Sequence, residues 1–208
     1  MTGTDTDTYA GGGAPHGLRV LRAADRVAAV WKNGGGVTRE IAARPQGAGM
    51  SDFAWRVSLA EVAADGPFSA FPDIDRTLTL AEGAGMDLTI GGLRHLVDER
   101  YAPRDFPGDQ PTDCRLLDGP VVNFNVMYRR GTAHARTAVV RGRLTLAAEP
   151  GETLLVVALG GPARLAPRPA GPAVTLAPYD AALTTGPAAY HLHTEGRAAI
   201  VTLGAPVP

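Results

Sequence analysis

The chain has 208 residues, of which 45% are hydrophobic and 20% charged, a balance typical of a globular protein with one large β domain or two small ones. Its formal net charge is −1 and Lys32 is its single lysine, so no basic tract indicates a nucleic-acid partner, and no apolar run has the length of a membrane span. One cysteine, Cys114, excludes a disulfide framework, and because no leading segment resembles a signal peptide we expect a cytoplasmic protein.

The pattern along the chain is that of an all-β protein. Residues 1–17 carry mostly Thr, Asp and Gly and predict a disordered tail, so the folded part is expected to begin near Leu18. From there, short segments that alternate with period two are separated by Gly, Pro and Asp. Few stretches could sustain a helix longer than about ten residues.

Residues 30–40 form the densest run of chemistry, reading Val-Trp-Lys-Asn-Gly-Gly-Gly-Val-Thr-Arg-Glu. Three successive glycines allow positive φ and a close approach of the backbone to a ligand or to another strand. After them the alternation predicts a strand that carries Thr38 and Glu40 on one face and Arg39 on the other. The stretch is therefore either part of a binding site or a glycine-rich turn with an exposed ion pair.

Two later strands combine an apolar face with a polar one. In residues 53–60 aromatic and aliphatic side chains alternate with Arg56 and Ser58, and in residues 121–130 they alternate with Asn123 and Asn125. Asparagine is depleted in strands unless its amide has a partner. These polar faces therefore line a cavity or face water.

The remaining segments suit a jelly roll or a barrel. Residues 74–80 and 86–90 predict a hairpin, and residues 103–111, which contain three prolines, predict a long loop. Strands are expected in the second half over residues 138–146, 153–159, 174–176, 179–183, 190–193 and 197–203. We expect two β units, residues 18–131 and residues 132–208, packed on each other.

The histidines do not predict a metal site. His191 and His193 are two residues apart, where a His-x-His pair on one strand face could chelate, but no third ligand stands at a helpful spacing. Cys114 has Arg115 beside it and no adjacent histidine, so the sequence does not indicate a nucleophile. We expect no metal and no other cofactor.

What remains is a set of polar residues on otherwise apolar strands, and burying such groups is costly unless they are paired. A small anionic or zwitterionic ligand would satisfy them, because the planar fork of arginine suits a carboxylate. The candidate ligand-binding residues are Lys32, Asn33, Thr38, Arg39, Glu40, Arg56, Ser58, Arg76, Asn123 and Asn125.

Together these stretches resemble the HutD/Ves family over nearly the whole folded chain. The segments that carry the resemblance are residues 31–40, 53–58, 65–69, 75–76, 106–109 and 123–131. The resemblance implies a cupin-like (RmlC-type) jelly roll built as two packed β-barrel units, a bicupin. After residue 132 the likeness is looser.

One departure from cupins proper concerns the metal. Those proteins carry a His-x-His motif followed by a glutamate and a glycine. Here the frame that ends in Gly83 places Arg76 where the glutamate would stand, and Phe71 or Pro72 where the second histidine would. A cation in place of a carboxylate changes the preference of the site from a metal ion to an anion.

The resemblance implies a link to bacterial histidine utilisation or, for Ves-type members, to stress response. The first hypothesis is a metal-free regulator that binds a small carboxylate such as formylglutamate, formiminoglutamate or urocanate, with Lys32, Arg76 and either Arg39 or Arg56 in its pocket. No nucleic-acid or membrane partner is expected, and a homodimer is a further possibility.

The second hypothesis is a metal-independent enzyme that acts on a small acidic or N-formyl amino-acid substrate. Glu40 would be its general base, and Lys32 or Arg76 would stabilise developing charge. This hypothesis is less favoured, because no histidine lies in the family-like segments and a histidine is the usual base near neutral pH.

Overall fold

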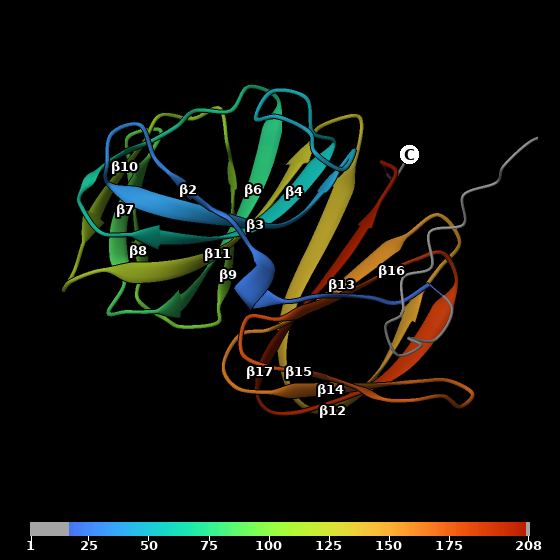
Figure 1. Ribbon diagram of the computed structural model, residues 1–208. Coiled ribbons are helices and arrows are strands. Elements are labelled where there is room, and N and C mark those ends of the chain that lie inside the picture. The colour runs from blue at the N-terminus through green and yellow to red at the C-terminus, as the bar shows by residue number, and fades with distance from the viewer. Residues whose placement is uncertain (1–16, 207–208) are drawn as a thin grey trace, which may run out of the picture.

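The computed structural model describes residues 17–206, so the tail expected over residues 1–17 lies, except for Gly17, outside the described residues. Two β units stand against each other, and strands β2 to β11 form one while β12 to β17 form most of the other (Figure 1). The only helical element in residues 17–206 is the short 3₁₀ turn η1 (Ala23–Asp25). No helix in this part of the chain is long and apolar enough to cross a membrane.

The N-terminal unit consists of two sheets. The larger has six strands in the order β2 (Ala28–Val30), β3 (Gly36–Arg44), β4 (Trp55–Val62), β11 (Val121–Arg129), β6 (Ile74–Glu82) and β9 (Pro103–Pro107). The smaller has four, in the order β5 (Gly66–Phe68), β10 (Thr112–Leu116), β7 (Met86–Ile90) and β8 (Leu93–Val97). Leu78 and Leu80 of the first sheet pack against Met86 and Leu88 of the second, so the two sheets enclose one interior.

The C-terminal unit is a single seven-stranded sheet. Its main path runs β1 (Arg19–Leu21), β16 (Ala181–Thr185), β13 (Thr153–Ala158), β17 (Ala188–Gly204), β14 (Ala163–Pro167) and β15 (Val174–Leu176), and β12 (His134–Ala148) also pairs with β17. The strand β1 pairs with β16 in antiparallel register. A strand from the predicted N-terminal unit, residues 18–131, is therefore part of the sheet of the C-terminal unit.

The two units share one hydrophobic core. Trp55, Val57 and Phe124 of the N-terminal unit belong to the same buried cluster as Leu155 and Val201 of the C-terminal unit. A hydrogen bond from the Tyr179 hydroxyl to the Glu82 carboxylate also joins the two units. Because this core takes one face of β4 and β11, only the other face of these strands is left for the interior of the N-terminal unit.

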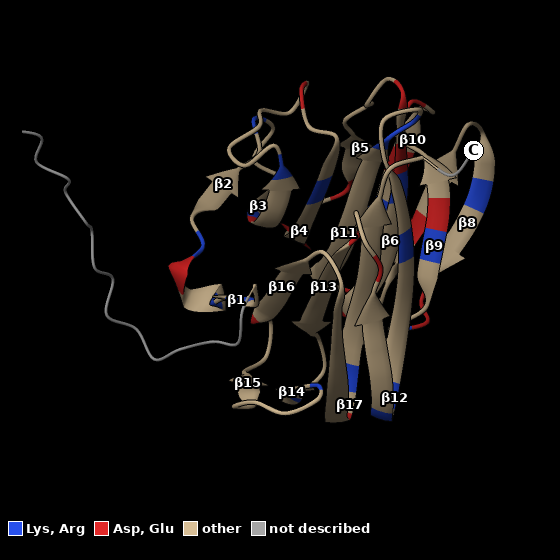
Figure 2. Ribbon diagram, turned by 90° about the vertical axis from the view of Figure 1, so that its right-hand side faces the viewer, with Lys and Arg blue, Asp and Glu red and all other residues tan. Residues whose placement is uncertain are grey.

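Two expectations about the strands are wrong. Residues 103–111 were expected to form a loop, but residues 103–107 form β9, an edge strand that pairs with β6 and carries charged side chains (Figure 2). Proline is tolerated at the ends of an edge strand, because the missing N–H is not needed there. The segments 190–193 and 197–203 were expected as separate strands, but they are parts of the continuous strand β17.

Candidate functional site

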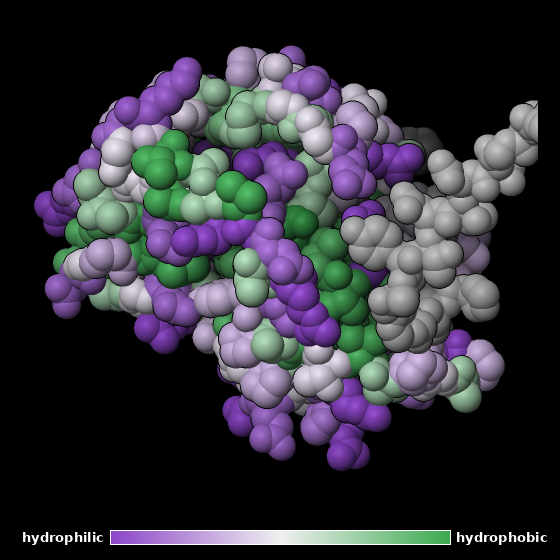
Figure 3. Space-filling view, viewed as in Figure 1, coloured by the Kyte–Doolittle hydropathy of each residue, from purple (hydrophilic) through white to green (hydrophobic). Residues whose placement is uncertain are grey.

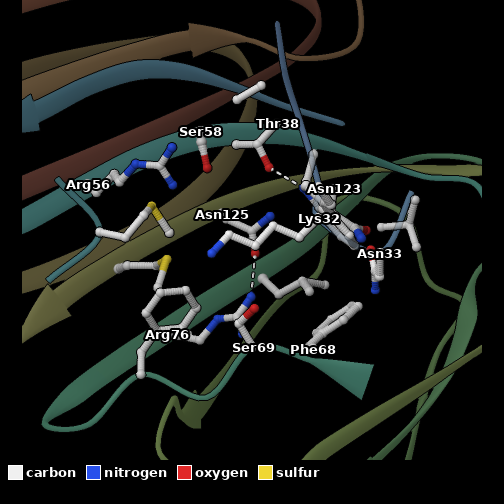
Figure 4. Close-up of a pocket in the computed structure, with 18 of the residues that line it drawn as sticks. Lys32, Asn33, Thr38, Arg56, Ser58, Phe68, Ser69, Arg76, Asn123 and Asn125 are labelled. Atoms are coloured by element: carbon white, nitrogen blue, oxygen red, sulfur yellow. Dashed lines mark hydrogen bonds between the residues drawn. The ribbon is translucent and has the colours of Figure 1, made fainter. Parts of the chain in front are cut away.

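A cavity of about 610 Å³ lies inside the N-terminal unit. The polar residues on its wall are Lys32, Asn33, Thr38, Arg56, Ser58, Ser69, Arg76, Asn123 and Asn125, and Figure 4 shows them around one space. The strands β4 and β11 place them by simple alternation, since Trp55, Val57, Phe124 and Val126 face the shared core while the residues between them face the cavity. The structure therefore brings together eight of the ten candidate ligand-binding residues.

Arg76 is a buried cation of the cavity wall, with a relative exposure of 8%, the same as that of Arg56. Its guanidinium carbon lies 5.5 Å, 5.7 Å and 5.1 Å from the ring centroids of Phe68, Phe71 and Phe106. Burial lowers the pKa of Arg76 to about 10, which still leaves the group charged at neutral pH. Three aromatic faces thus hold this cation in place of a carboxylate.

The hydrogen bonding of Arg76 is incomplete. Its Nη2 donates a long bond of 3.5 Å to Asn125 Oδ1, and its buried Nε has no partner among the described residues. No carboxylate in residues 17–206 forms an ion pair with it. A buried guanidinium without a counterion is costly, and an anion in the cavity would remove that cost.

The glycine Gly108 makes room for Arg76. A Cβ atom on Gly108 would stand 3.2 Å from Arg76 Cγ and Cδ and 2.8 Å from the Ile74 carbonyl oxygen. The backbone of Gly108 also donates to Ile74 O and accepts from Phe71 N, each at 2.7 Å. The Phe-Pro-Gly-Asp segment at residues 106–109 is thus a structural support for the cation.

The three residues before the glycines, Trp31, Lys32 and Asn33, line the cavity. Trp31 Nε1 donates to Thr38 Oγ1 at 2.8 Å, and its ring packs edge-on against Phe68 with 6.3 Å between centroids. A Cβ on Gly36 would lie 2.5 Å from the Glu61 carbonyl oxygen and 3.1 Å from the Trp31 ring, so a side chain does not fit there. On the same face, hydrophobic residues gather near β2, where Val30 is 72% exposed (Figure 3). The absence of a side chain at Gly36 therefore allows the turn that carries Lys32 to join β2 to β3, with Trp31 N donating to Gly36 O at 3.0 Å.

The structure does not bring Arg39 and Glu40 to the cavity wall. Arg39 lies on the opposite face of β3 and forms an exposed ion pair with Glu61. Glu40 accepts a hydrogen bond of 2.8 Å from Arg56 Nε, so it contacts a wall residue although it is not itself on the wall. This contact engages Oε2 of the carboxylate that the enzyme hypothesis would use as a base.

Asn123 is the second incompletely bonded group. Its exposed fraction is 1%, its Nδ2 donates only to Met86 Sδ at 3.7 Å, and its Oδ1 has no partner among the described residues. An amide oxygen accepts N–H or O–H donors. The cavity therefore offers a buried, unpartnered acceptor beside its donors.

The model of the HutD family matches residues 23–202. The chain belongs to the HutD family. It is 35% identical over 141 residues to an uncharacterised 21.2 kDa protein in the hutC 3′ region of Pseudomonas putida, covering 68% of this chain and 74% of that one. It is 39% identical over 112 residues to the protein Ves of Cronobacter sakazakii, covering 53% and 60%.

Solved structures agree with this assignment. HutD from Pseudomonas fluorescens SBW25 superposes with a TM-score of 0.79 at 31% identity, covering 91% of this chain and all of the other. The expected cupin-like fold is also confirmed, since a cupin 2 conserved barrel protein from Leptotrichia buccalis superposes with a TM-score of 0.54 over 82% of this chain and 89% of that one. At 11% identity this second likeness shows the fold alone.

The metal that the cupin fold implies does not fit this HutD-family cavity. Its wall carries Lys32, Arg56 and Arg76 and contains no His, Cys, Asp or Glu among the described residues. Residues 17–206 contain no group of three or more such side chains that could hold a metal ion. His191 and His193 lie on an exposed face of β17, outside the cavity. The charged side chains of the cavity wall are all cations, so they are suited to an anion and not to a metal ion.

Sequence reasoning missed the aromatic rings around Arg76. Phe68, Phe71 and Phe106 come from three separate segments, and period-two alternation says nothing about which segments meet. A signal was present, because the HutD-like segments 65–69 and 106–109 contain two of the three phenylalanines.

Proposed function

We propose that the cavity binds a small carboxylate and that the protein acts as a ligand-binding regulator. The observation that carries the proposal is Arg76, a buried cation with an unpartnered Nε on the wall of the cavity and no internal counterion in the described chain. A carboxylate would accept charge-assisted hydrogen bonds from it.

The rest of the wall supports an acceptor-rich ligand. Lys32 and Arg56 add positive charge, and the hydroxyl of Ser58 adds a donor. A volume of about 610 Å³ is within the range of small-molecule sites. The free Asn123 Oδ1 favours a carboxylate that also bears an N–H group.

The pathway proposed for this ligand is bacterial histidine utilisation. The support is the family assignment and the Pseudomonas putida relative in the hutC 3′ region. Formylglutamate, formiminoglutamate and urocanate are the candidate ligands, since each combines a carboxylate with an N–H group.

The test is to titrate the purified protein with each of these three compounds and to measure binding by isothermal titration calorimetry. Arg76→Ala should weaken the best ligand about tenfold or more, and Arg76→Lys, which keeps the charge but loses the planar fork, should fall between. The protein is also incubated with the ligand. A regulator would leave the ligand unchanged, whereas an enzyme would convert it to product. Equal affinity in the wild-type protein and Arg76→Ala would falsify the proposal.

A further inference from the structure

We infer that Glu40 is a positioning residue, which orients the Arg56 guanidinium toward the cavity and does not touch the ligand. The inference rests on the proposed carboxylate binding. Arg56 is on the cavity wall and Glu40 is not, although the two are joined by a hydrogen bond of 2.8 Å.

The atom that Glu40 binds determines what Arg56 can still do. The bond is made by Arg56 Nε, the donor nearest to the side-chain stem, so it fixes the plane of the guanidinium. The two terminal nitrogens remain for another acceptor, and the end of Arg56 points toward Ser58 on the cavity wall (Figure 4). The side chain of Arg56 is 10% exposed and that of Glu40 is 38% exposed, so the carboxylate holds the cation from the solvent side.

The backbone of β3 places the carboxylate. Glu40 lies opposite Ser58 on β4, and Ser58 shares the cavity face with Arg56, so Glu40 is a diagonal neighbour of Arg56. Just after Glu40 the register shifts, with Ala42 opposite Val57. This β-bulge turns Ile41 and Ala42 toward the shared core and ends the cavity face of β3 at Glu40.

Glu40 has two opposite effects on an anion in the cavity. It orients a donor, which strengthens binding, and it brings a negative charge near the site, which weakens binding. Glu40→Gln keeps an oxygen that can accept from Arg56 Nε but removes the charge. Glu40→Ala removes both the acceptor oxygen and the negative charge. Comparing the two variants therefore separates the effect of orienting Arg56 from the effect of the charge of Glu40.

The experiment measures the affinity for N-formyl-L-glutamate by calorimetry at pH 7.5 in low salt. We expect Glu40→Gln to bind within about twofold of the wild-type protein or more tightly, and Glu40→Ala to bind about fivefold or more weakly than Glu40→Gln. Equal weakening in both variants would mean that the ligand contacts Glu40. Equal tightening would mean that only its charge matters. Either result overturns the inference.

Two further arms complete the test. In an Arg56→Ala background, Glu40→Ala should cause no additional weakening, because the group that it orients is gone. Glu61→Gln and Glu61→Ala are the matched controls, since Glu61 pairs with Arg39 away from the cavity, and neither should change affinity. Circular dichroism establishes that each variant is folded.

A readout without ligand separates this inference from the proposed function. The rate at which phenylglyoxal modifies Arg56, followed by mass spectrometry, should be higher in Glu40→Ala than in Glu40→Gln. Equal rates overturn the positioning role. If the wild-type protein binds no carboxylate while the rates differ, the proposed function fails and the orientation of Arg56 stands.

Discussion

Phe106 on β9 lies directly opposite Arg76 on β6, with its ring centroid 5.1 Å from the guanidinium carbon. The ring faces attract the cation without neutralising it, so the charge remains available to a ligand. A carboxylate in the same place would satisfy the arginine internally. If the cavity binds a carboxylate as proposed, the aromatic setting lowers the stability of the free protein in favour of binding.

The first prediction follows from this trade. Arg76→Met should raise the free energy of unfolding by about 1 kcal/mol or more, because it replaces a buried, unpaired cation with an apolar side chain of similar length. Urea denaturation of the ligand-free proteins measures the effect. A clear loss of stability in Arg76→Met would show that the three rings fully compensate the buried charge.

The second prediction concerns Gly108. Gly108→Ala should lower the free energy of unfolding by about 1–3 kcal/mol, because its Cβ would approach the Ile74 carbonyl oxygen and the Arg76 stem. It should also weaken ligand binding by displacing Arg76. Gly204→Ala is the control, since its Cβ would meet only Glu152 Cγ at 3.8 Å. Similar stability losses in both variants would contradict this account.

The cavity face could be predicted from alternation alone. The pattern assigned Arg56, Ser58, Asn123 and Asn125 to the polar faces of two strands, and all four line the cavity. This works because a half-buried strand must place successive side chains on opposite faces. It does not require knowledge of which strands pair.

The roles of Arg39 and Glu40 could not be predicted in the same way. Alternation correctly separates their faces, but both were candidates because both stand in the dense polar run that follows the glycines. Whether a carboxylate faces a ligand or binds an arginine depends on a cross-strand partner and on a β-bulge. Both are set by pairing with a distant strand.

The third prediction concerns Asp180, which accepts hydrogen bonds from Ala23 N at 2.8 Å, Arg22 Nη1 at 2.7 Å and Ala177 N at 3.1 Å. Burial alone would raise its pKa, but these bonds outweigh burial and hold the pKa below the usual 3.8. Asp180→Asn should therefore lose about 1–3 kcal/mol of stability at pH 7.

The pH dependence of this effect has a definite sign. Because the pKa of Asp180 is lower in the folded state than in the unfolded state, its contribution is complete above about pH 5 and is lost as the pH falls below about 4. Thermal unfolding of both proteins across this range tests the point. A gap between wild-type and Asp180→Asn that stays constant down to pH 2 would rule out this role.

The fourth prediction concerns Cys114, which is buried and does not line the cavity. Burial, with a smaller effect of Asp65, raises the pKa of its thiol to about 12. The folded protein should therefore react slowly with Ellman's reagent at pH 8 and rapidly after unfolding in guanidinium. Cys114→Ala should leave ligand affinity unchanged, and a loss of binding in a folded variant would contradict this.

The fifth prediction concerns metal. We expect the purified protein to contain no stoichiometric transition metal, because the cavity wall offers cations where a metal needs carboxylate, imidazole or thiolate ligands. EDTA should leave the melting temperature unchanged. Elemental analysis that finds one bound Zn, Fe, Mn or Ni per chain would refute this, and His191→Ala and His193→Ala would then identify the exposed pair as its location.

The pairing of β1 with β16 has a consequence for how the molecule is made. Arg19 lies opposite Leu183, so one of the first described strands to leave the ribosome has its partner near the other end of the chain. Closing so long a loop is entropically costly, and folds dominated by such distant pairings form slowly. In the nascent chain β1 therefore lacks its partner until Ala181–Thr185 has been synthesised, and the C-terminal sheet can be completed only after that.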